Sequence, residues 1–178
     1  ALLDEPLLQL SNGEHKKVFM IGDKPKRNSE LISFYNDERE LLTNFFVWFK
    51  QIDPDIIIGW HVIGFDLLFL DNKCRELGIS LDIARANGRV SIRQRKPSGH
   101  FISVTGRVVI DGPTMLRASF FSFEDFKLET VAQELLGTGK TITPDENKIE
   151  EIDRQFREDK FALAEYNLQD AVLVTDIF

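Results

Sequence analysis

The sequence predicts a single α/β domain spanning residues 1–178, and three observations support this fold class. A length of 178 residues with 43% hydrophobic residues is enough for one ordinary core. The β-branched run from Ile56 to Ile58 predicts a short strand buried on both faces. Apolar residues then recur at helical spacing from Phe65 until Gly78, which predicts a helix. Asp66 is therefore expected in the first helical turn after a buried strand, where open α/β sheets bind ligands.

The chain before this stretch predicts three strands and a helix. Short apolar runs at 7–10, 17–21 and 31–35 are separated by turn residues, which favours an antiparallel meander. Asp37, followed three residues later by Glu40, resembles a capping box, so a helix should begin there. The apolar face of that helix holds Leu41, Phe45, Trp48 and Ile52.

The chain after this stretch predicts a strand-rich segment and then a helical half. Strands are expected on both sides of a Pro-Ser-Gly turn that begins at Pro97, and Pro113 suits the first turn of a helix. The expected strands are 89–95, 101–104 and 107–111, and the expected helices are 128–136, ended by Gly137, and a longer one from about Lys160 to the chain end.

The charge distribution predicts one basic segment on an acidic body. The net charge of −7 argues against a protein that binds nucleic acid mainly by neutralising phosphates. Residues 83–110 contain no acidic residue, while Arg85, Arg89, Arg93, Arg95, Lys96 and Arg107 are basic. Two interpretations remain open, a solvated hairpin and a basic flap beside an acidic, cation-binding cleft.

The sequence has no feature typical of a secreted or membrane protein. It contains no signal-peptide pattern, no lipidation motif and no run of about 18 or more apolar residues. Its single cysteine, Cys74, lies on the apolar face of the helix after Phe65 and is predicted to be a small buried hydrophobe. We therefore expect a protein of the reducing cytoplasm, without a membrane partner.

The last predicted helix has two apolar faces and an acidic residue on one of them. A helix covered on two sides is buried, and a buried carboxylate needs hydrogen bonds, a positive partner or a metal. Asp170 is such a residue, and Tyr166 lies one turn before it on the same side. Two simpler explanations remain open, because Asp170 could pair with an arginine and Asp66 could be favoured by the helix dipole.

Two aspartates at strand and helix ends, with a tyrosine beside one, suit phosphoryl chemistry with divalent metals. Mg²⁺ and Mn²⁺ prefer carboxylate and water oxygens, and a metal pair about 3.5–4 Å apart can activate water and stabilise a leaving oxygen. The sequence has no GxSxG, Walker, GxGxxG, CxxC or HExxH motif, so the corresponding chemistries are not indicated.

Two motifs resemble the 3′–5′ proofreading exonuclease domain of family B DNA polymerases, in particular its bacterial DNA polymerase II members. DPDIIIGWHVIGFDL, which begins at Asp53, resembles the second exonuclease motif. YNLQD, from Tyr166 to Asp170, resembles the third motif, of the Tyr-x-x-x-Asp form. GRVVIDG and LETVAQELLGTGK, which lie between them, also resemble the family pattern.

This resemblance implies a fold, a reaction and a set of site residues. The fold would be a ribonuclease H-like mixed sheet flanked by helices, with a basic β-hairpin insertion. Asp66 and Asp170 would bind two divalent metal ions, Mg²⁺ or Mn²⁺, and Tyr166 would position the water that hydrolyses the 3′-terminal phosphodiester of DNA. His61 and Phe65 would line the path of the terminal nucleotides.

The resemblance also implies partners and a location. The partners would be the single-stranded 3′ end of a DNA primer, the remainder of a polymerase chain and, through the full-length protein, a sliding clamp. The location would be the nucleoid within the cytoplasm.

Two departures from the family pattern limit this transfer. Asparagine is usual where this chain has His61, so either a titratable group contacts the substrate or a histidine merely fills the place. The first motif, Asp-x-Glu, is absent, because Asp4 and Glu5 are adjacent and a strand would send them to opposite faces. We therefore expect a piece of a longer chain, weak or inactive alone, and keep as the alternative a degenerate module that binds DNA or partner domains without cleavage.

Overall fold

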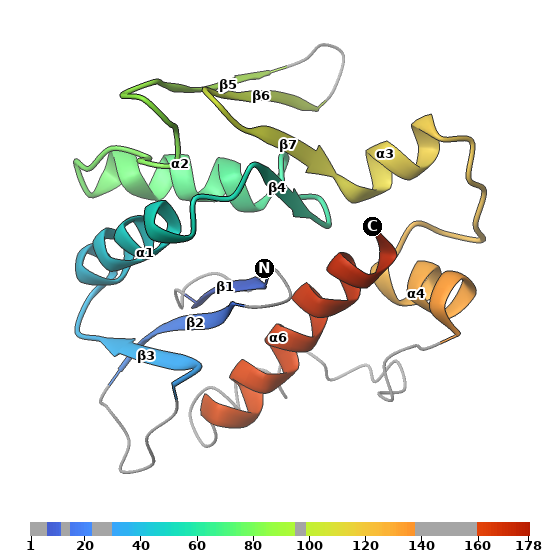
Figure 1. Ribbon diagram of the computed structural model, residues 1–178, viewed down its shortest axis with the longest axis horizontal. Coiled ribbons are helices and arrows are strands. Elements are labelled where there is room, and N and C mark those ends of the chain that lie inside the picture. The colour runs from blue at the N-terminus through green and yellow to red at the C-terminus, as the bar shows by residue number, and fades with distance from the viewer. Residues whose placement is uncertain (1–6, 12–14, 23–29, 95–98, 138–159) are drawn as a thin grey trace. The chain divides into compact units, whose positions relative to one another are not determined.

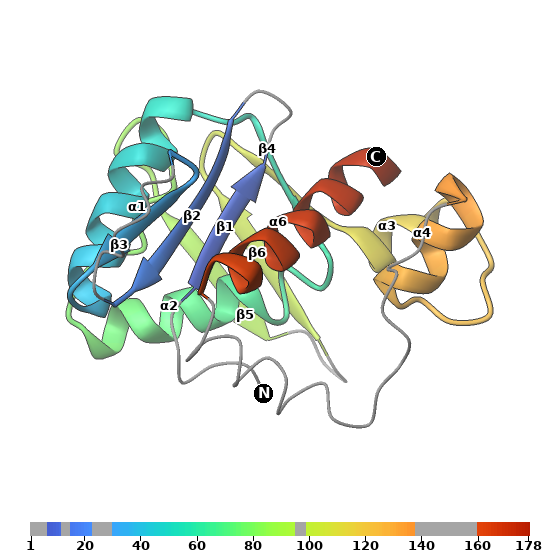
Figure 2. The ribbon, with the colours of Figure 1, turned by 90° about the horizontal axis from the view of Figure 1, so that it is seen from below.

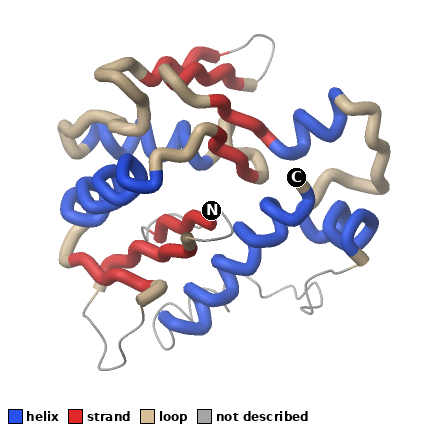
Figure 3. Tube along the Cα trace, in the orientation of Figure 1, coloured by secondary structure: helices blue, strands red, loops and turns tan. Residues whose placement is uncertain are grey.

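The structure is a computed structural model that describes residues 7–11, 15–22, 30–94, 99–137 and 160–178. These residues form small sheets and helices, so the fold is mixed α/β, as predicted (Figure 3). The chain divides into two compact units, one of residues 1–41 with 123–178 and one of residues 42–122. Each unit is described in turn.

The first unit contains a three-stranded sheet in the order β1-β2-β3. Strand β1 (Leu7–Ser11) pairs antiparallel with β2 (Lys16–Ile21), whereas β2 pairs in parallel with β3 (Ile32–Tyr35). The prediction of an antiparallel meander is therefore wrong for the second pair. Turn residues between β2 and β3 favoured a hairpin, but the connection, residues 22–31, is long enough to return the chain to the other end of the sheet.

Helix α6 (Lys160–Ile177) packs on this sheet and contacts both β1 and β2 (Figures 1 and 2). Ala164 of the helix is buried, and Leu168, one turn later, packs against the same cluster. Helix α4 (Leu128–Leu136) contacts α6 and ends at Gly137, whose left-handed backbone donates its N–H to the carbonyl oxygen of Gln133. Residues of the sheet in this core are Val18, Met20, Ile32 and Phe34.

Helix α1 (Glu38–Ile52) begins in the first unit and continues in the second. Its predicted cap is confirmed, because the Asp37 carboxylate accepts the Glu40 N–H at 2.8 Å. The Glu40 carboxylate reaches back and accepts the backbone N–H of Asn36 at 3.0 Å. The buried side chains of α1 are Leu41, Leu42, Phe45, Phe46 and Phe49.

The second unit contains two pairs of strands and two further helices. Parallel strands β4 (Ile56–Gly59) and β7 (Val108–Asp111) form one sheet, and antiparallel β5 (Val90–Gln94) and β6 (His100–Val104) form a hairpin. The chain passes from β6 into β7 and then into α3 (Figure 1). Helix α2 (Asp66–Glu76) follows β4, and helix α3 is Gly112–Ala118.

Strand β4 is buried on one face only. Ile57 is buried, but Ile56 is 52% exposed, and Val108, its partner in the register, is 56% exposed. The prediction of a strand buried on both faces is therefore wrong for Ile56, because burial of a face requires another element to cover it. The local run of isoleucines could not reveal what covers each face.

Helix α2 has the predicted length and the predicted inner face. It ends one residue before Leu77, and Gly78 then adopts a left-handed backbone with φ of 63°. Leu67, Leu70 and Cys74 are its buried residues, so Cys74 is the small buried hydrophobe expected. Burial raises the pKa of its thiol to about 11. Of the helices within the described ranges, none is long and apolar enough to cross a membrane.

Candidate active site

The loop between β4 and α2 is built by a tight turn that ends at Asp66. Gly59 closes β4, and His61 adopts a left-handed backbone with φ of 62°. The N–H of Phe65 donates to the carbonyl oxygen of His61 at 3.0 Å, and that of Leu67 donates to Val62 at 2.9 Å. Asp66 is thus the first residue of α2, at the carboxyl end of β4, as predicted.

The surroundings of the Asp66 carboxylate disfavour its charge. Desolvation is the largest cause and raises its pKa; its own backbone N–H lowers the pKa, the charge of Asp111 raises it, and His61 lowers it. The residue is nevertheless exposed. Both statements hold, because desolvation depends on the density of protein around the carboxylate and not only on whether water touches it.

Asp111 is a second acidic residue at this edge of the β4–β7 sheet. In the parallel register Asp111 lies opposite Gly59, so both strands end together. Its carboxylate caps α3, accepting the Thr114 N–H at 3.3 Å and the Thr114 hydroxyl at 2.7 Å. Asp111 was not among the predicted site residues. The strand predicted over 107–111 ends at this aspartate, so the sequence did contain a signal for an acid at the end of a strand.

Tyr166 and Asp170 both lie in α6, a helix of the first unit. Asp170 is half-buried, and Leu173, close to it along the helix, is buried. Ala164 and Leu168, which helical spacing places on the other face, pack on the sheet. The prediction that both faces of this helix are covered is therefore confirmed for these positions. The side chain of Tyr166 lies outside the described residues.

The predicted site residues divide between the two units. His61, Phe65 and Asp66 belong to the second unit, and Tyr166 and Asp170 belong to the first. The electrostatic coupling of Asp66 to His61 and Asp111 is internal to the second unit. The joining of Asp66 with Asp170 in one metal site stays a prediction.

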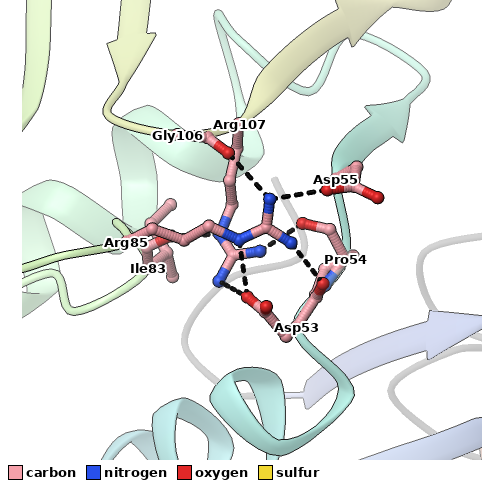
Figure 4. Close-up of polar contacts among 7 residues, drawn as sticks. All are labelled: Asp53, Pro54, Asp55, Ile83, Arg85, Gly106 and Arg107. Atoms are coloured by element: carbon pink, nitrogen blue, oxygen red, sulfur yellow. Dashed lines mark hydrogen bonds and ion pairs between the residues drawn. The ribbon is translucent and has the colours of Figure 1, made fainter.

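A cluster of two arginines and two aspartates holds the other end of β4 (Figure 4). Arg85 donates to the carboxylates of Asp53 at 2.7 Å and Asp55 at 2.5 Å, and to the carbonyl oxygens of Asp53 and Gly106. These bonds hold Asp53, whose backbone φ is 48°. The hydrogen bond from Arg85 is the main cause that lowers the pKa of the Asp53 carboxylate. We call this arrangement, with Arg107, the arginine clasp.

Arg107 is the buried member of the arginine clasp. Its side chain is 1% exposed and lies over the ring of Phe49 at 4.9 Å. It donates to the carbonyl oxygens of Ile83, at 2.7 Å, and Pro54, and it pairs with Asp53 at 2.8 Å. Two of the six basic residues predicted for a flap therefore have a structural role at the start of β4.

The other basic residues lie in or near the β5–β6 hairpin. Arg89 and Arg93 are exposed, and Arg93 lies opposite the exposed Phe101 in the antiparallel register. Arg95 and Lys96 lie outside the described residues. The solvated hairpin and the basic flap both remain compatible with this arrangement.

Residues 6–131, which include the β4–α2 loop and Asp111, match the family described as DNA polymerase family B, exonuclease domain. The chain belongs to this family. It is 42% identical to DNA polymerase II of Escherichia coli (strain K12) over 166 residues, which are 90% of this chain and 21% of that protein. A DNA polymerase of Archaeoglobus fulgidus is 32% identical over 161 residues, 89% of this chain and 19% of that protein. The chain therefore spans about a fifth of the length of these relatives.

Asp66 lies at the edge of the β4–β7 sheet, within the residues that match the exonuclease family. The side chains at this edge can be compared with those of a metal site. Among the side chains that the structure describes, no three of His, Cys, Asp and Glu gather as a metal-binding group. Within the second unit, the acidic side chains at this edge are Asp66 and, near it, Asp111. A carboxylate whose charge is disfavoured by desolvation and by a like charge fits a divalent cation, since the cation would offset both effects.

Proposed function

We propose that this chain is the proofreading 3′–5′ exonuclease domain of a polymerase of the bacterial DNA polymerase II type. Its reaction is hydrolysis of the 3′-terminal phosphodiester of DNA. The observation that carries the proposal is Asp66, an acid with a raised pKa at the carboxyl end of β4, within a chain that belongs to the exonuclease family. Perturbed acids at such sheet edges are typical of functional sites.

Asp66 and Asp170 are the residues that would hold the metal ions, two Mg²⁺ or Mn²⁺. When bound, these ions supply charge stabilisation and lower the pKa of water at the scissile phosphate. Asp111, the neighbour of Asp66, adds negative potential that attracts cations to this edge. The joint site would combine one aspartate from each unit, within one proposed ribonuclease H-like domain of residues 1–178.

The remaining residues bind and orient the DNA. Tyr166 would hold the attacking water through its phenolic oxygen, one helical turn from Asp170. Phe65, which is 45% exposed beside Asp66, offers a ring on which a terminal base can stack. His61 has a left-handed backbone, which asparagine and histidine adopt more readily than most residues. This backbone accounts for the exchange of asparagine for histidine without requiring a new role in the chemistry.

The proposed partners are the single-stranded primer 3′ end, the rest of the polymerase chain and, through that chain, a sliding clamp on nucleoid DNA. Arg89 and Arg93 of the hairpin would contact the phosphates of the single strand. The chain contains no Asp-x-Glu, so its own carboxylates supply only part of the family's metal-binding set. We propose that exonuclease activity of this polypeptide alone is weak or absent.

Metal binding tests the proposed site without relying on turnover. Mn²⁺ should raise the melting temperature of the chain, because a ligand that binds only the folded state stabilises it, by about 1.4 kcal/mol at tenfold excess over Kd. Asp66→Asn and Asp170→Asn should each reduce the shift. Asp176→Asn, on the exposed face of the same helix α6, is the matched control and should keep it. An equal shift in all three variants would contradict the assignment.

Activity distinguishes the enzyme from the non-cleaving alternative. The parent polymerase should shorten a 5′-labelled single strand from its 3′ end in Mg²⁺, and Asp66→Asn should lower the rate at least about a hundredfold. The isolated chain should cleave slowly or not at all. A parent that binds the strand without shortening it would favour the degenerate module, and rapid digestion by the isolated chain would contradict the expected weakness.

A further inference from the structure

Gly112, the first residue of α3, lies directly against the indole ring of Trp60. A Cβ atom added at residue 112 would lie 2.8 Å from Cε3 and 3.0 Å from Cζ3 of Trp60, and 3.4 Å from the carbonyl oxygen of Gly59. Real Cβ contacts below 3.0 Å are essentially absent, so the ring would have to move. Gly112 is buried, and close packing in a protein interior leaves little room for an added methyl group.

An added Cβ would also lie less than 3.0 Å from another atom at Gly59, Gly88 and Gly106, but this is not so at every glycine. Gly64, within the same β4–α2 loop, would meet no atom within 4 Å if it carried a Cβ. Gly99 and Gly137 are equally open, and their glycines are explained by backbone φ angles of 103° and 67°. Gly112 has no such angle, so what the position requires is the space that the ring occupies.

Trp60 connects this contact to the functional loop. It follows the last residue of β4 and precedes His61, whose carbonyl oxygen accepts the N–H of Phe65. The start of the loop is closely packed, since a Cβ at Gly59 would lie 2.7 Å from the Cβ of Val62. A displaced indole would therefore shift the turn that carries His61 and Phe65 and that starts α2 at Asp66.

We infer that Gly112 is a positioning residue, which seats Trp60 and through it sets the β4–α2 loop that receives the 3′-terminal nucleotide. That the loop receives the nucleotide rests on the proposed function. That Gly112 positions Trp60 rests only on the contact between the two residues. Gly112 itself touches no reacting atom. It acts from α3, far along the chain from the loop that it positions.

The test uses the complete chain with Trp48→Phe, which leaves Trp60 as the one indole. Gly112→Ala, Gly64→Ala, Trp60→Leu and the double variant Gly112→Ala/Trp60→Leu are compared with it. One measurement is the emission and acrylamide quenching of Trp60. The other is the anisotropy of a 5′-fluorescein single-stranded oligodeoxynucleotide with a free 3′ hydroxyl, titrated in EDTA so that no cleavage occurs.

Gly112→Ala should change the emission of Trp60 and weaken oligonucleotide binding about fivefold to tenfold, because overpacking displaces the loop. Gly64→Ala should leave both unchanged. The double variant should bind within about twofold of Trp60→Leu alone, since without the ring a methyl group at 112 meets nothing. This rescue would not occur if Gly112 served only the stability of α3.

Several outcomes would overturn the inference. One is an unchanged Trp60 emission in Gly112→Ala, and another is a changed emission with an unchanged affinity for the oligonucleotide. A third is a double variant whose affinity is reduced relative to Trp60→Leu by the same factor as that of Gly112→Ala relative to its parent. If Gly112→Ala does not fold, Trp60→Leu decides, because a folded variant with undiminished affinity contradicts a role for the ring. If the unaltered chain does not bind the oligonucleotide, the proposed function fails, while the emission still decides whether Gly112 seats Trp60.

Discussion

Replacing Arg107 by alanine should destabilise the second unit more than any change to an exposed arginine. The variant leaves the carbonyl oxygens of Ile83 and Pro54 without the donor that each has now, at about 1–2 kcal/mol for each, since both bonds are only part-buried. It also removes the guanidinium from the ring of Phe49, worth about 1 kcal/mol. Asp53 keeps Arg85 as a partner, so its loss is small. We expect a total of about 3–5 kcal/mol.

Urea unfolding followed by tryptophan fluorescence measures this effect. Both tryptophans, Trp48 and Trp60, belong to the second unit, so the emission reports the unit that contains Arg107. With a slope of about 2 kcal/mol per molar urea, the midpoint should fall by about 2 M. Arg93→Ala, on the exposed face of β5, is the matched control and should change stability by less than about 0.5 kcal/mol. Equal midpoints for the two variants would refute the structural role of the clasp.

Three further predictions follow from the described contacts. Asp66→Asn should have a higher melting temperature than the unaltered chain at pH 7 and the same melting temperature at about pH 3. The reason is that the pKa of Asp66 is raised in the folded state, so stability falls as the pH rises through the ordinary pKa and then the raised one. An equal difference in melting temperature at both pH values would contradict this. Asp37→Ala should cost about 1 kcal/mol in urea unfolding and Asp37→Ser much less, since serine also caps; equal losses would exclude a capping role. Ile57→Ala should cost about 2–4 kcal/mol and Ile56→Ala less than about 1, and similar losses would show that β4 is covered on both faces.

Features set by nearby residues were predictable from the sequence. Asp66 begins α2 because the β-branched run, the loop and the helical spacing lie next to one another in the chain. The cap of α1 at Asp37 and the end of α4 at Gly137 were predicted for the same reason. Each depends on contacts within a few residues, which a pattern can represent.

Features set by distant residues were not predictable. The parallel pairing of β2 with β3 depends on the course of the connection between them, and the exposure of Ile56 depends on what covers its face of β4. Arg85 and Arg107 counted as flap residues because their acidic partners lie about thirty or more positions earlier in the chain. Asp111 was not predicted as a site residue, because its closeness to the β4–α2 loop depends on the pairing of β4 with β7, two strands that lie far apart in the sequence.

The site could be predicted only in part, for the same reason. The motif around Asp66 is local, and the structure places it as expected at the start of a helix. Its relation to Asp170 joins residues that are more than a hundred positions apart and belong to separate units, so it remains a prediction. The contact of Trp60 with Gly112 had no sequence signal, because a glycine after an aspartate is also an ordinary helix start.

The arginine clasp also has a consequence for the order of events during folding. Arg107 bonds to Pro54, 53 positions earlier in the chain, and Arg85 bonds to Asp53, 32 positions earlier. Contacts that close such long loops form late unless a nucleus already holds the segments together. We therefore expect Arg107→Ala to accelerate unfolding while leaving the refolding rate nearly unchanged. In that case the clasp slows unfolding at the start of β4, and the lifetime of the folded unit depends on it.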